Sequence, residues 1–247
     1  MGASRTRRKS SGLSRQTLRG ILFAVAFLLI PGCVALLRTL GHLESVAEES
    51  GAKVLALSLP FGVFLAGFMA AGIASVSLAL PTKPYVAVHE ATHALFGWLS
   101  FSKVSRFTVK ETHGSVRVEH PTMLGLLAPY FFPLPAVAIL LVFGCVSLFS
   151  APVGTPWTTA FCALEGIAWG LHFSYTVNAL LQHQTDLDEF GFFFSFLFIV
   201  FLNLVFLLVL FVALTPTTCG QAVSWFGAEF HSSLAWIYDL LWGQQRL

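Results

Sequence analysis

Charged residues are scarce in this chain, and their scarcity excludes an ordinary soluble enzyme. Lys, Arg, Asp and Glu make up 11% of the 247 residues, whereas a soluble domain carries about 25%. Hydrophobic residues reach 56%, and the mean hydropathy is +0.77. The composition therefore predicts a polytopic membrane protein. The net charge of +2 carries little information because the basic residues are clustered, and nothing in the sequence indicates nucleic-acid binding.

Paired cysteines are also lacking. The four cysteines, Cys33, Cys145, Cys162 and Cys219, show no pairing pattern, and the first three lie in apolar stretches. They are interpreted as packing residues, which leaves the redox compartment undetermined. No internal repeat is visible, and the length suits one compact membrane domain without a separate soluble domain.

Long apolar runs set the predicted architecture. Runs of about 20 residues are candidate membrane spans, and we expect an all-α polytopic fold with about six of them, near 19–38, 53–80, 84–101, 122–149, 156–182 and 190–214. The predicted organisation is a basic N-terminus (1–18), two N-terminal spans (19–80), a core (81–215) and a tail (216–247). A short acidic loop, 41–51, separates the first two spans. In the tail, Phe226, Phe230 and Leu234 recur on one face, which is typical of an interfacial amphipathic helix.

The N-terminus is basic, with Arg5, Arg7, Arg8, Lys9 and Arg15 ahead of the first apolar run. The positive-inside rule predicts that this end stays in the cytoplasm. The first run lacks a small-residue cleavage site, so it is interpreted as an uncleaved signal anchor. We expect a multi-pass protein in the cell membrane of a bacterium.

A metal-binding pattern stands inside the third apolar run. His89-Glu90-Ala91-Thr92-His93 spells H-E-x-x-H, and no glycine or proline interrupts residues 85–96. Residues four apart share one face of a helix, so His89 and His93 are both predicted to bind one zinc ion. Glu90 has the position of the general base in such sites. Polar groups in apolar surroundings are expensive, which disfavours a chance match.

A β-hairpin is predicted near 103–119. Polar and apolar residues alternate along Val104–Lys110 and again from Val116 to Glu119, with a turn at Thr112-His113-Gly114 between them. Two interpretations remain open: a surface hairpin without a direct role, and an edge strand, Val104–Lys110, that pairs with an extended substrate peptide. Two topologies of the zinc helix are possible: it crosses the membrane, or it doubles back to the side from which it entered. The second is favoured by the basic residues of the hairpin, Lys103, Arg106, Lys110 and Arg117.

A catalytic zinc has three protein ligands, and the sequence offers several candidates for the third. Those in apolar or interfacial positions are Glu165, His172, Asp186 and Asp188. Glu165 and His172 are seven apart, hence on one face of a predicted helix, which is equally typical of a hydrogen-bonded helix seam. Asp186 and Asp188 precede a long span, where acidic residues are also ordinary helix caps.

The order of these features resembles the site-2 protease family of intramembrane zinc metalloproteases. The similarity covers about residues 84–215 and is closest at His-Glu-Ala-Thr-His-Ala-Leu-Phe-Gly-Trp-Leu, 89–99, with a weaker small-Pro element at Ala128-Pro129-Tyr130. The family's usual Asn-Pro-Asp-Gly is absent, and Gln184-Thr185-Asp186 stands in its place.

The resemblance implies His89, His93 and Asp186 as zinc ligands, one Zn²⁺ per chain, and Glu90 as catalytic base. It also implies a membrane-embedded metallopeptidase whose partners are the lipid bilayer and a transmembrane or membrane-proximal peptide. Two alternatives remain: a catalytically inactive scaffold of the same fold, and a zinc-dependent membrane hydrolase that acts on a lipid.

Overall fold

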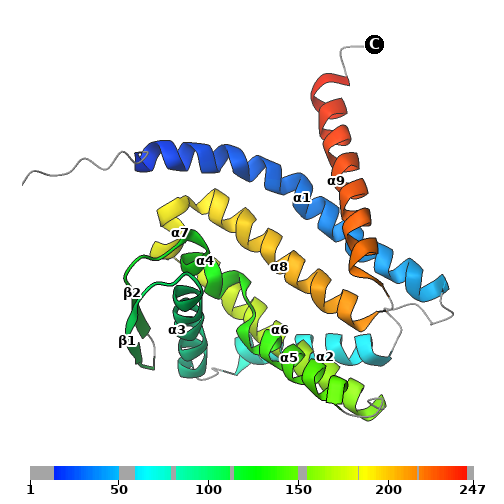
Figure 1. Ribbon diagram of the computed structural model, residues 1–247, viewed down its shortest axis with the longest axis horizontal. Coiled ribbons are helices and arrows are strands. Elements are labelled where there is room, and N and C mark those ends of the chain that lie inside the picture. Colours follow the sequence, from blue (N-terminus) through cyan, green and yellow to red (C-terminus); the bar gives the residue numbers. More distant parts are fainter. Residues whose placement is uncertain are drawn as a thin grey trace, which may run out of the picture.

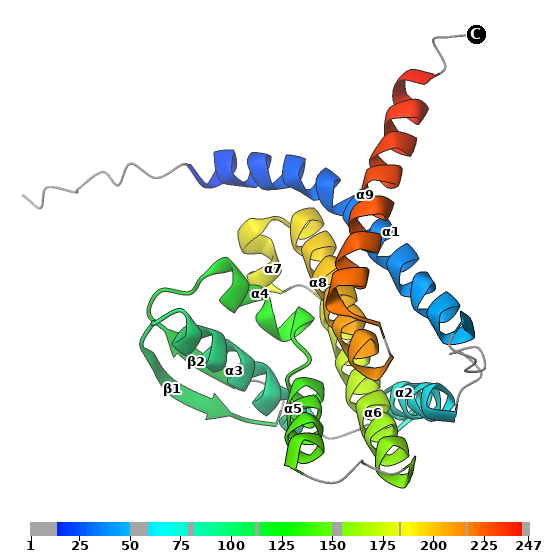
Figure 2. The same ribbon diagram turned by 45° about the vertical axis from the view of Figure 1, so that its right-hand side comes forward.

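The computed structural model describes residues 14–49, 59–78, 82–111, 114–149, 155–182, 184–215 and 217–243. Most of the basic N-terminus, including Arg5 to Lys9, and the predicted turn residues Thr112 and His113 lie outside these ranges. Long helices dominate the molecule, and a hairpin lies against α3 at one end of it (Figures 1 and 2).

The helices within the described ranges are α1 (Arg15–Glu49), α2 (Leu59–Ser77), α3 (Thr82–Leu99), α4 (Met123–Phe131), α5 (Leu134–Phe149), α6 (Thr155–Leu180), α7 (Thr185–Phe190), α8 (Phe192–Leu214) and α9 (Cys219–Trp242). The strands β1 (Val104–Val109) and β2 (Gly114–Val118) form one antiparallel pair. The predicted helical class and the predicted hairpin are both confirmed.

The predicted number of spans is wrong. By length and composition, three described helical segments could cross a membrane: Gln16–Leu43, Pro60–Ser77 and Phe192–Leu214. A fourth crossing is possible if α4 and α5, bent by 77° at the break between them, count as one span. The predicted spans 84–101 and 156–182 correspond to α3 and α6, and neither helix is among those that could cross a membrane by length and composition. Their polar residues, such as His89, Glu90 and His93 in α3 and Glu165 and His172 in α6, lower their hydropathy.

The first helix is also longer than predicted. α1 continues to Glu49 through most of the expected acidic loop. The extension contains Leu43, Glu44, Ala47, Glu48 and Glu49, all good helix formers. The polar residues after Leu43 therefore end the apolar run, but they do not end the helix.

Glycines bring α2 and α6 into close contact. A Cβ added to Gly166 would lie 2.1 Å from the Phe64 carbonyl oxygen, and one added to Gly170 would lie 2.4 Å from that of Phe68. On the facing helix, a Cβ on Gly67 would approach the Ala163 carbonyl oxygen to 2.8 Å. Small residues of this kind let two helices pack backbone against backbone, so α2 and α6 lie in close contact along this side of the molecule.

α1 runs parallel to α8, with both helices starting at the same end of the molecule. Near their starts, the Phe23 and Phe27 rings lie 5.2 and 5.6 Å from the Phe193 ring. Further along, Gly32 packs on the Phe201 ring. The start of α1 therefore lies beside α7, which directly precedes α8 (Figure 1).

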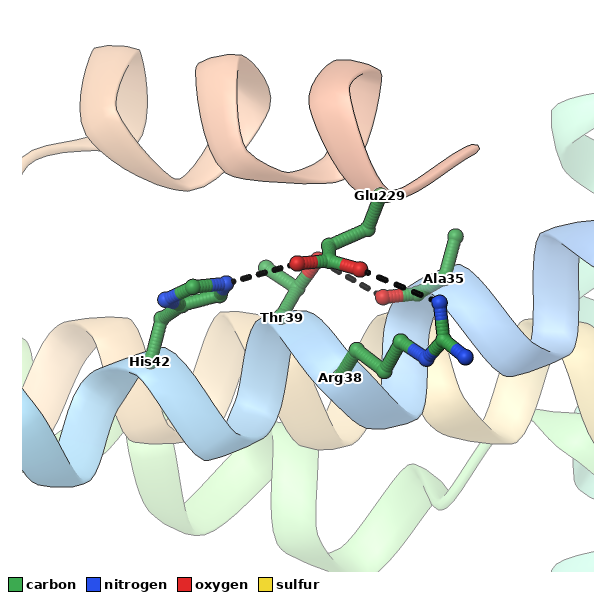
Figure 3. A network of polar contacts seen from close by, with 5 residues as sticks. All are labelled: Ala35, Arg38, Thr39, His42 and Glu229. Carbon is green, nitrogen blue, oxygen red and sulfur yellow. Dashed lines mark hydrogen bonds and ion pairs between the residues drawn. The ribbon is translucent and has the colours of Figure 1, made fainter. Parts of the chain in front are cut away.

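An ion-pair network holds α9 against α1 (Figure 3). The Glu229 carboxylate lies 2.9 Å from His42 Nε2 and 3.5 Å from Arg38 Nη1, and the His42 ring stacks on Trp225. The sequence pattern places Glu229 away from the apolar face of α9, whereas the structure directs it to α1. The hydrogen bond from His42 and the nearby positive charges lower the pKa of Glu229 below its usual range.

We expect Glu229→Gln to loosen α9 from α1, because the amide keeps the shape of the side chain but loses its charge. Amides of 225–235 should then exchange with deuterium faster than in the wild type. Asp239→Asn, an exposed change on the same helix, should leave exchange unaltered. Since the folded-state pKa of Glu229 is depressed, its contribution is present above the ordinary carboxyl pKa and is lost as pH falls through the folded value. This role would be contradicted if protection of 225–235 were the same in Glu229→Gln as in the wild type and did not fall in the wild type at acidic pH.

Candidate metal centre

The helix α3 presents the two motif histidines on one face, as the spacing predicts. Pro84 lies in its first turn, where a missing backbone N–H costs no helical hydrogen bond. The rings of His89 and His93 lie 4.9 Å apart, nearly perpendicular to each other. Both side chains point into a cavity of about 350 Å³, whose wall also includes Glu90, Gly125 and Asp186.

The short helix α7 delivers Asp186 to the same cavity. Gly191 ends α7 with φ of 90°, a conformation that favours glycine, and α8 begins at the next residue. The buried Ser195 hydroxyl donates to the Leu187 carbonyl oxygen at 2.9 Å. Arg19 of α1 donates to the carbonyl oxygens of Asp188 and Glu189 at the C-terminal end of α7, where a positive charge is favourable. Both neighbouring long helices thus fix α7.

Asp186 is not the N-cap of α7. The cap position belongs to Gln184, whose side chain makes no capping hydrogen bond, and Asp186 stands in the first turn. Its carboxylate turns instead toward α3. Burial alone would raise the pKa of Asp186, but the hydrogen bond and charge of His93, with smaller effects from His89 and Tyr130, bring it below the ordinary value. The residue is accordingly set up as a carboxylate, the form that binds metal.

Ligand atoms of His89, His93 and Asp186 all lie within 4.8 Å of one another. His93 Nε2 is 3.6 Å from Asp186 Oδ2. Neighbouring ligands of a tetrahedral zinc are about 3.3–3.5 Å apart, given bonds of about 2.0–2.2 Å. The His93–Asp186 separation matches that spacing, and the remaining pairs need to close by about 1.5 Å or less. Two imidazoles and a carboxylate form a donor set that suits zinc.

The second nitrogen of each imidazole faces a protein group. His93 Nδ1 lies 2.8 Å from the carbonyl oxygen of Gly125 in α4. That carbonyl accepts only a protonated Nδ1, so Nε2 is left unprotonated toward Asp186 in the neutral ring. His89 Nδ1 has a longer contact, 3.5 Å, with the Tyr85 hydroxyl one turn earlier on α3. The Gly125 contact thereby leaves Nε2 of His93 available to a metal.

The strand β2 covers Glu90, the predicted catalytic base. Glu90 is 8% exposed, and its carboxylate accepts a hydrogen bond from the backbone N–H of Val116. Gly114 allows this approach, because an added Cβ would lie 2.5 Å from Glu90 Cγ and 2.7 Å from Val86 Cγ1. The carboxylate is therefore held at the cavity wall beside the histidines.

The predicted substrate strand, Val104–Lys110, corresponds to β1, but the cavity wall is built from β2. Gly114, Ser115, Val116 and Val118 line the cavity, whereas no described residue of β1 does. β1 contains a register irregularity between Ser105 and Thr108, and Arg106 there has φ of 53°. Bulges and charges of this kind blunt an edge against further pairing.

Tyr130 connects the candidate ligands to α6 and α8. Its side chain is fully buried, its hydroxyl donates to Asp186 Oδ2 at 3.2 Å, and its ring stands edge-on to His89. Its carbonyl oxygen lies at the break between α4 and α5 and has no helical partner there. Pro133 has no N–H, and the Leu134 N–H donates to the carbonyl oxygen of Phe132. Thr176 and Asn203 donate to that carbonyl oxygen at 3.2 and 3.0 Å, replacing the missing helical partner.

We expect Tyr130→Phe to weaken zinc binding about 10–100-fold, the usual effect of losing an outer hydrogen bond to a ligand. The ring still fills its space, so the thermal unfolding midpoint should change little. Competition with a chromogenic chelator measures the affinity. Tyr238→Phe on the exposed part of α9 is the matched control and should leave the affinity unchanged. Equal affinities of the two variants would show that the Tyr130 hydroxyl does not support the site.

The structure separates the other candidate ligands from this cluster. His172 lies on α6 with Nε2 3.1 Å from Asn203 Oδ1, so it supports the residue that holds Tyr130. Glu165 is fully buried, with no hydrogen-bond partner within the described ranges. Asp188, also on α7, is not part of the cluster. Over the described residues, the cluster that could hold a metal comprises His89, His93 and Asp186.

Sequence reasoning missed the supporting residues. Tyr130 stands in the small-Pro element of the sequence, but that pattern marks neither its hydroxyl nor the backbone groups of Gly125 and Val116 as supports. The proline pair Pro133 and Pro135 after Tyr130 is a further signal, because it predicts unpaired carbonyl oxygens in the preceding turn.

No protein-family profile, curated protein or solved structure matches this chain. The site therefore rests on its own residues and geometry.

Proposed function

We propose that this chain is an intramembrane zinc metallopeptidase, a divergent relative of the site-2 protease family. The observation that carries the proposal is the convergence of His89 and His93 from α3 with Asp186 from α7, with Glu90 at the same cavity wall. These ligand atoms come from two helices and lie within 4.8 Å of one another, and the His93–Asp186 pair, 93 residues apart in sequence, has the spacing expected for two ligands of one zinc.

The chemistry would divide between the metal and Glu90. Zinc bound there would polarise the scissile carbonyl and lower the pKa of its water toward about 7. Glu90 would accept the proton of the attacking water and return it to the leaving amine. The Val116 N–H orients its carboxylate for both transfers. Tyr130 and the Gly125 carbonyl keep Asp186 and His93 in place.

The substrate segment would be extended at the cavity. A helical substrate hides its carbonyls in i→i−4 hydrogen bonds, so it must unwind before attack. Because Ser115 and Arg117 pair with β1, alternation directs the backbone groups of Val116 to the other edge of β2. The Val116 N–H is bonded to Glu90, so the Val116 carbonyl oxygen and the neighbouring backbone groups of that edge would be the hydrogen-bond partners of the unwound segment. The sequence-based proposal of an edge strand thus moves from β1 to β2.

The catalytic cavity would face the cytoplasmic side of the membrane. Its ligand helix α7 lies beside the start of α1, where Arg19 reaches it. The basic residues of the N-terminus precede that start, and the positive-inside rule assigns them to the cytoplasm.

The test compares membranes of the source cells that carry either the wild-type chain or Glu90→Gln. Sequencing of new protein N-termini should reveal termini in or beside apolar spans that appear only with the wild type. Lipid analysis of the same membranes covers the lipid-hydrolase alternative. A change in lipid products without new termini would replace the peptidase proposal. Identical termini and lipids, with unchanged partners, would favour a catalytically silent scaffold.

A further inference from the structure

A second cavity adjoins the candidate metal centre on the far side of His89. Its volume is about 270 Å³, and its wall contains His89 itself together with apolar residues of α3, α5 and α6, among them Val88, Pro135 and Leu171. The first cavity contains the carboxylates and shares only His89 with this one. The two cavities therefore meet at His89, which lies in the wall of both.

Two polar contacts at the wall of this second cavity occupy groups that could otherwise bind a ligand. His172 Nε2 is bonded to Asn203, and the Tyr85 hydroxyl lies against His89 Nδ1. The rings of Tyr85 and Tyr175 stack at 4.2 Å and add an aromatic surface. A ligand here would be recognised by shape and apolar contact, since few hydrogen-bonding groups are left for it.

The size of the cavity indicates what it accepts. A dry protein cavity of about 150 Å³ holds a benzene molecule, so one of about 270 Å³ has room for a phenyl or indole ring. Pro84 at its wall is exposed, and Tyr85 and Tyr175 are half-buried, so the cavity reaches the protein surface. A bound segment at Glu90 could extend a side chain past His89 into this space.

We propose that this cavity is the specificity pocket of the enzyme, which takes a large apolar or aromatic side chain next to the scissile bond. The inference rests on the proposed function. It predicts that the peptidase selects cleavage sites flanked by Phe, Trp, Leu or Met over sites flanked by Ala or Gly.

Hydroxamic acids make the pocket measurable without a known substrate, because the hydroxamate chelates zinc while its substituent probes the second cavity. Three probes are used on the zinc-loaded protein: acetohydroxamic, phenylacetohydroxamic and nonanohydroxamic acid. Calorimetry should show the phenyl probe binding about 10–100-fold more tightly than the methyl probe, as expected for burying an aromatic side chain.

Leu171→Trp fills the cavity and should abolish the phenyl preference while acetohydroxamate affinity stays constant. Leu171→Phe should give an intermediate loss, which keeps the test valid if the larger change disturbs folding. Leu164→Trp is the matched control, since it makes the same change on α6 in a different apolar cavity, between α5 and α6. It should keep the full preference.

The outcomes separate the two proposals. Equal binding of methyl and phenyl probes to zinc-loaded wild type, or a preference that survives Leu171→Trp, would overturn the pocket and leave the metal centre intact. Tightest binding of the nonanoyl probe, also lost in Leu171→Trp, would assign the cavity to a lipid chain and overturn the side-chain assignment. A folded wild type that binds neither zinc nor acetohydroxamate would defeat the proposed function itself.

Discussion

Glu90→Gln is expected to slow peptide cleavage about 10²–10⁴-fold, the range lost when a general acid–base group is removed. The amide cannot accept the proton of the attacking water, but it keeps the size of the side chain and can still accept the Val116 hydrogen bond. Zinc content should stay at about one per chain, since Glu90 is outside the cluster of His89, His93 and Asp186. Cleavage is followed on a membrane substrate identified from the new N-termini.

Glu165→Gln is the matched control for this prediction. It makes the same change at another buried carboxyl group, on α6, outside the metal cluster. Its cleavage rate should equal that of the wild type. If both variants held one zinc per chain and cleaved at comparable rates, Glu90 would not be the general base.

Asp186→Ala is expected to abolish stoichiometric zinc binding. The loss removes one of three protein ligands, so the affinity should fall by more than the roughly 10–100-fold typical of an outer-shell partner. The variant also leaves the Tyr130 hydroxyl without its acceptor in a fully buried position. An unsatisfied buried polar group costs about 1–3 kcal/mol, so a modest drop in thermal stability should accompany the loss of zinc.

Asp188→Ala provides the comparison for Asp186, because it makes the same change two residues further along α7. It should retain about one zinc per chain. His172→Ala should retain zinc as well, although with weaker affinity, since His172 acts through Asn203 and Tyr130. If Asp186→Ala retained zinc and His172→Ala lost it, the third ligand would be His172 on α6 and not Asp186.

Local features of this fold could be predicted from sequence because each has a short-range physical cause. The four-residue spacing of His89 and His93 fixes their common face, and the alternation at Val104–Val109 and Gly114–Val118 marks the hairpin. Asp186 could be placed just before the last long span because the apolar run near 190–214 begins a few residues after it. Its orientation toward α3 could not be deduced, since an aspartate there is equally able to act as a cap.

Features that depend on tertiary packing could not be read in advance. Hydropathy alone suggested spans at 84–101 and 156–182, yet α3 and α6 gather their polar residues around the site and around Tyr130. The role of Tyr130 depends on a helix break, two side chains from α6 and α8, and a carboxylate from α7. The Arg19 contact with α7 joins residues about 170 positions apart in the chain, so no local sequence pattern predicts it.

The most direct test of the metal centre is zinc X-ray absorption spectroscopy on the purified, detergent-solubilised wild type, with metal content measured on the same sample. The predicted result is about one zinc per chain with nitrogen and oxygen neighbours at about 2.0–2.2 Å and no sulfur at about 2.3 Å. A folded protein without stoichiometric zinc, or a zinc bound through any of the four cysteines, would contradict a centre built from His89, His93 and Asp186.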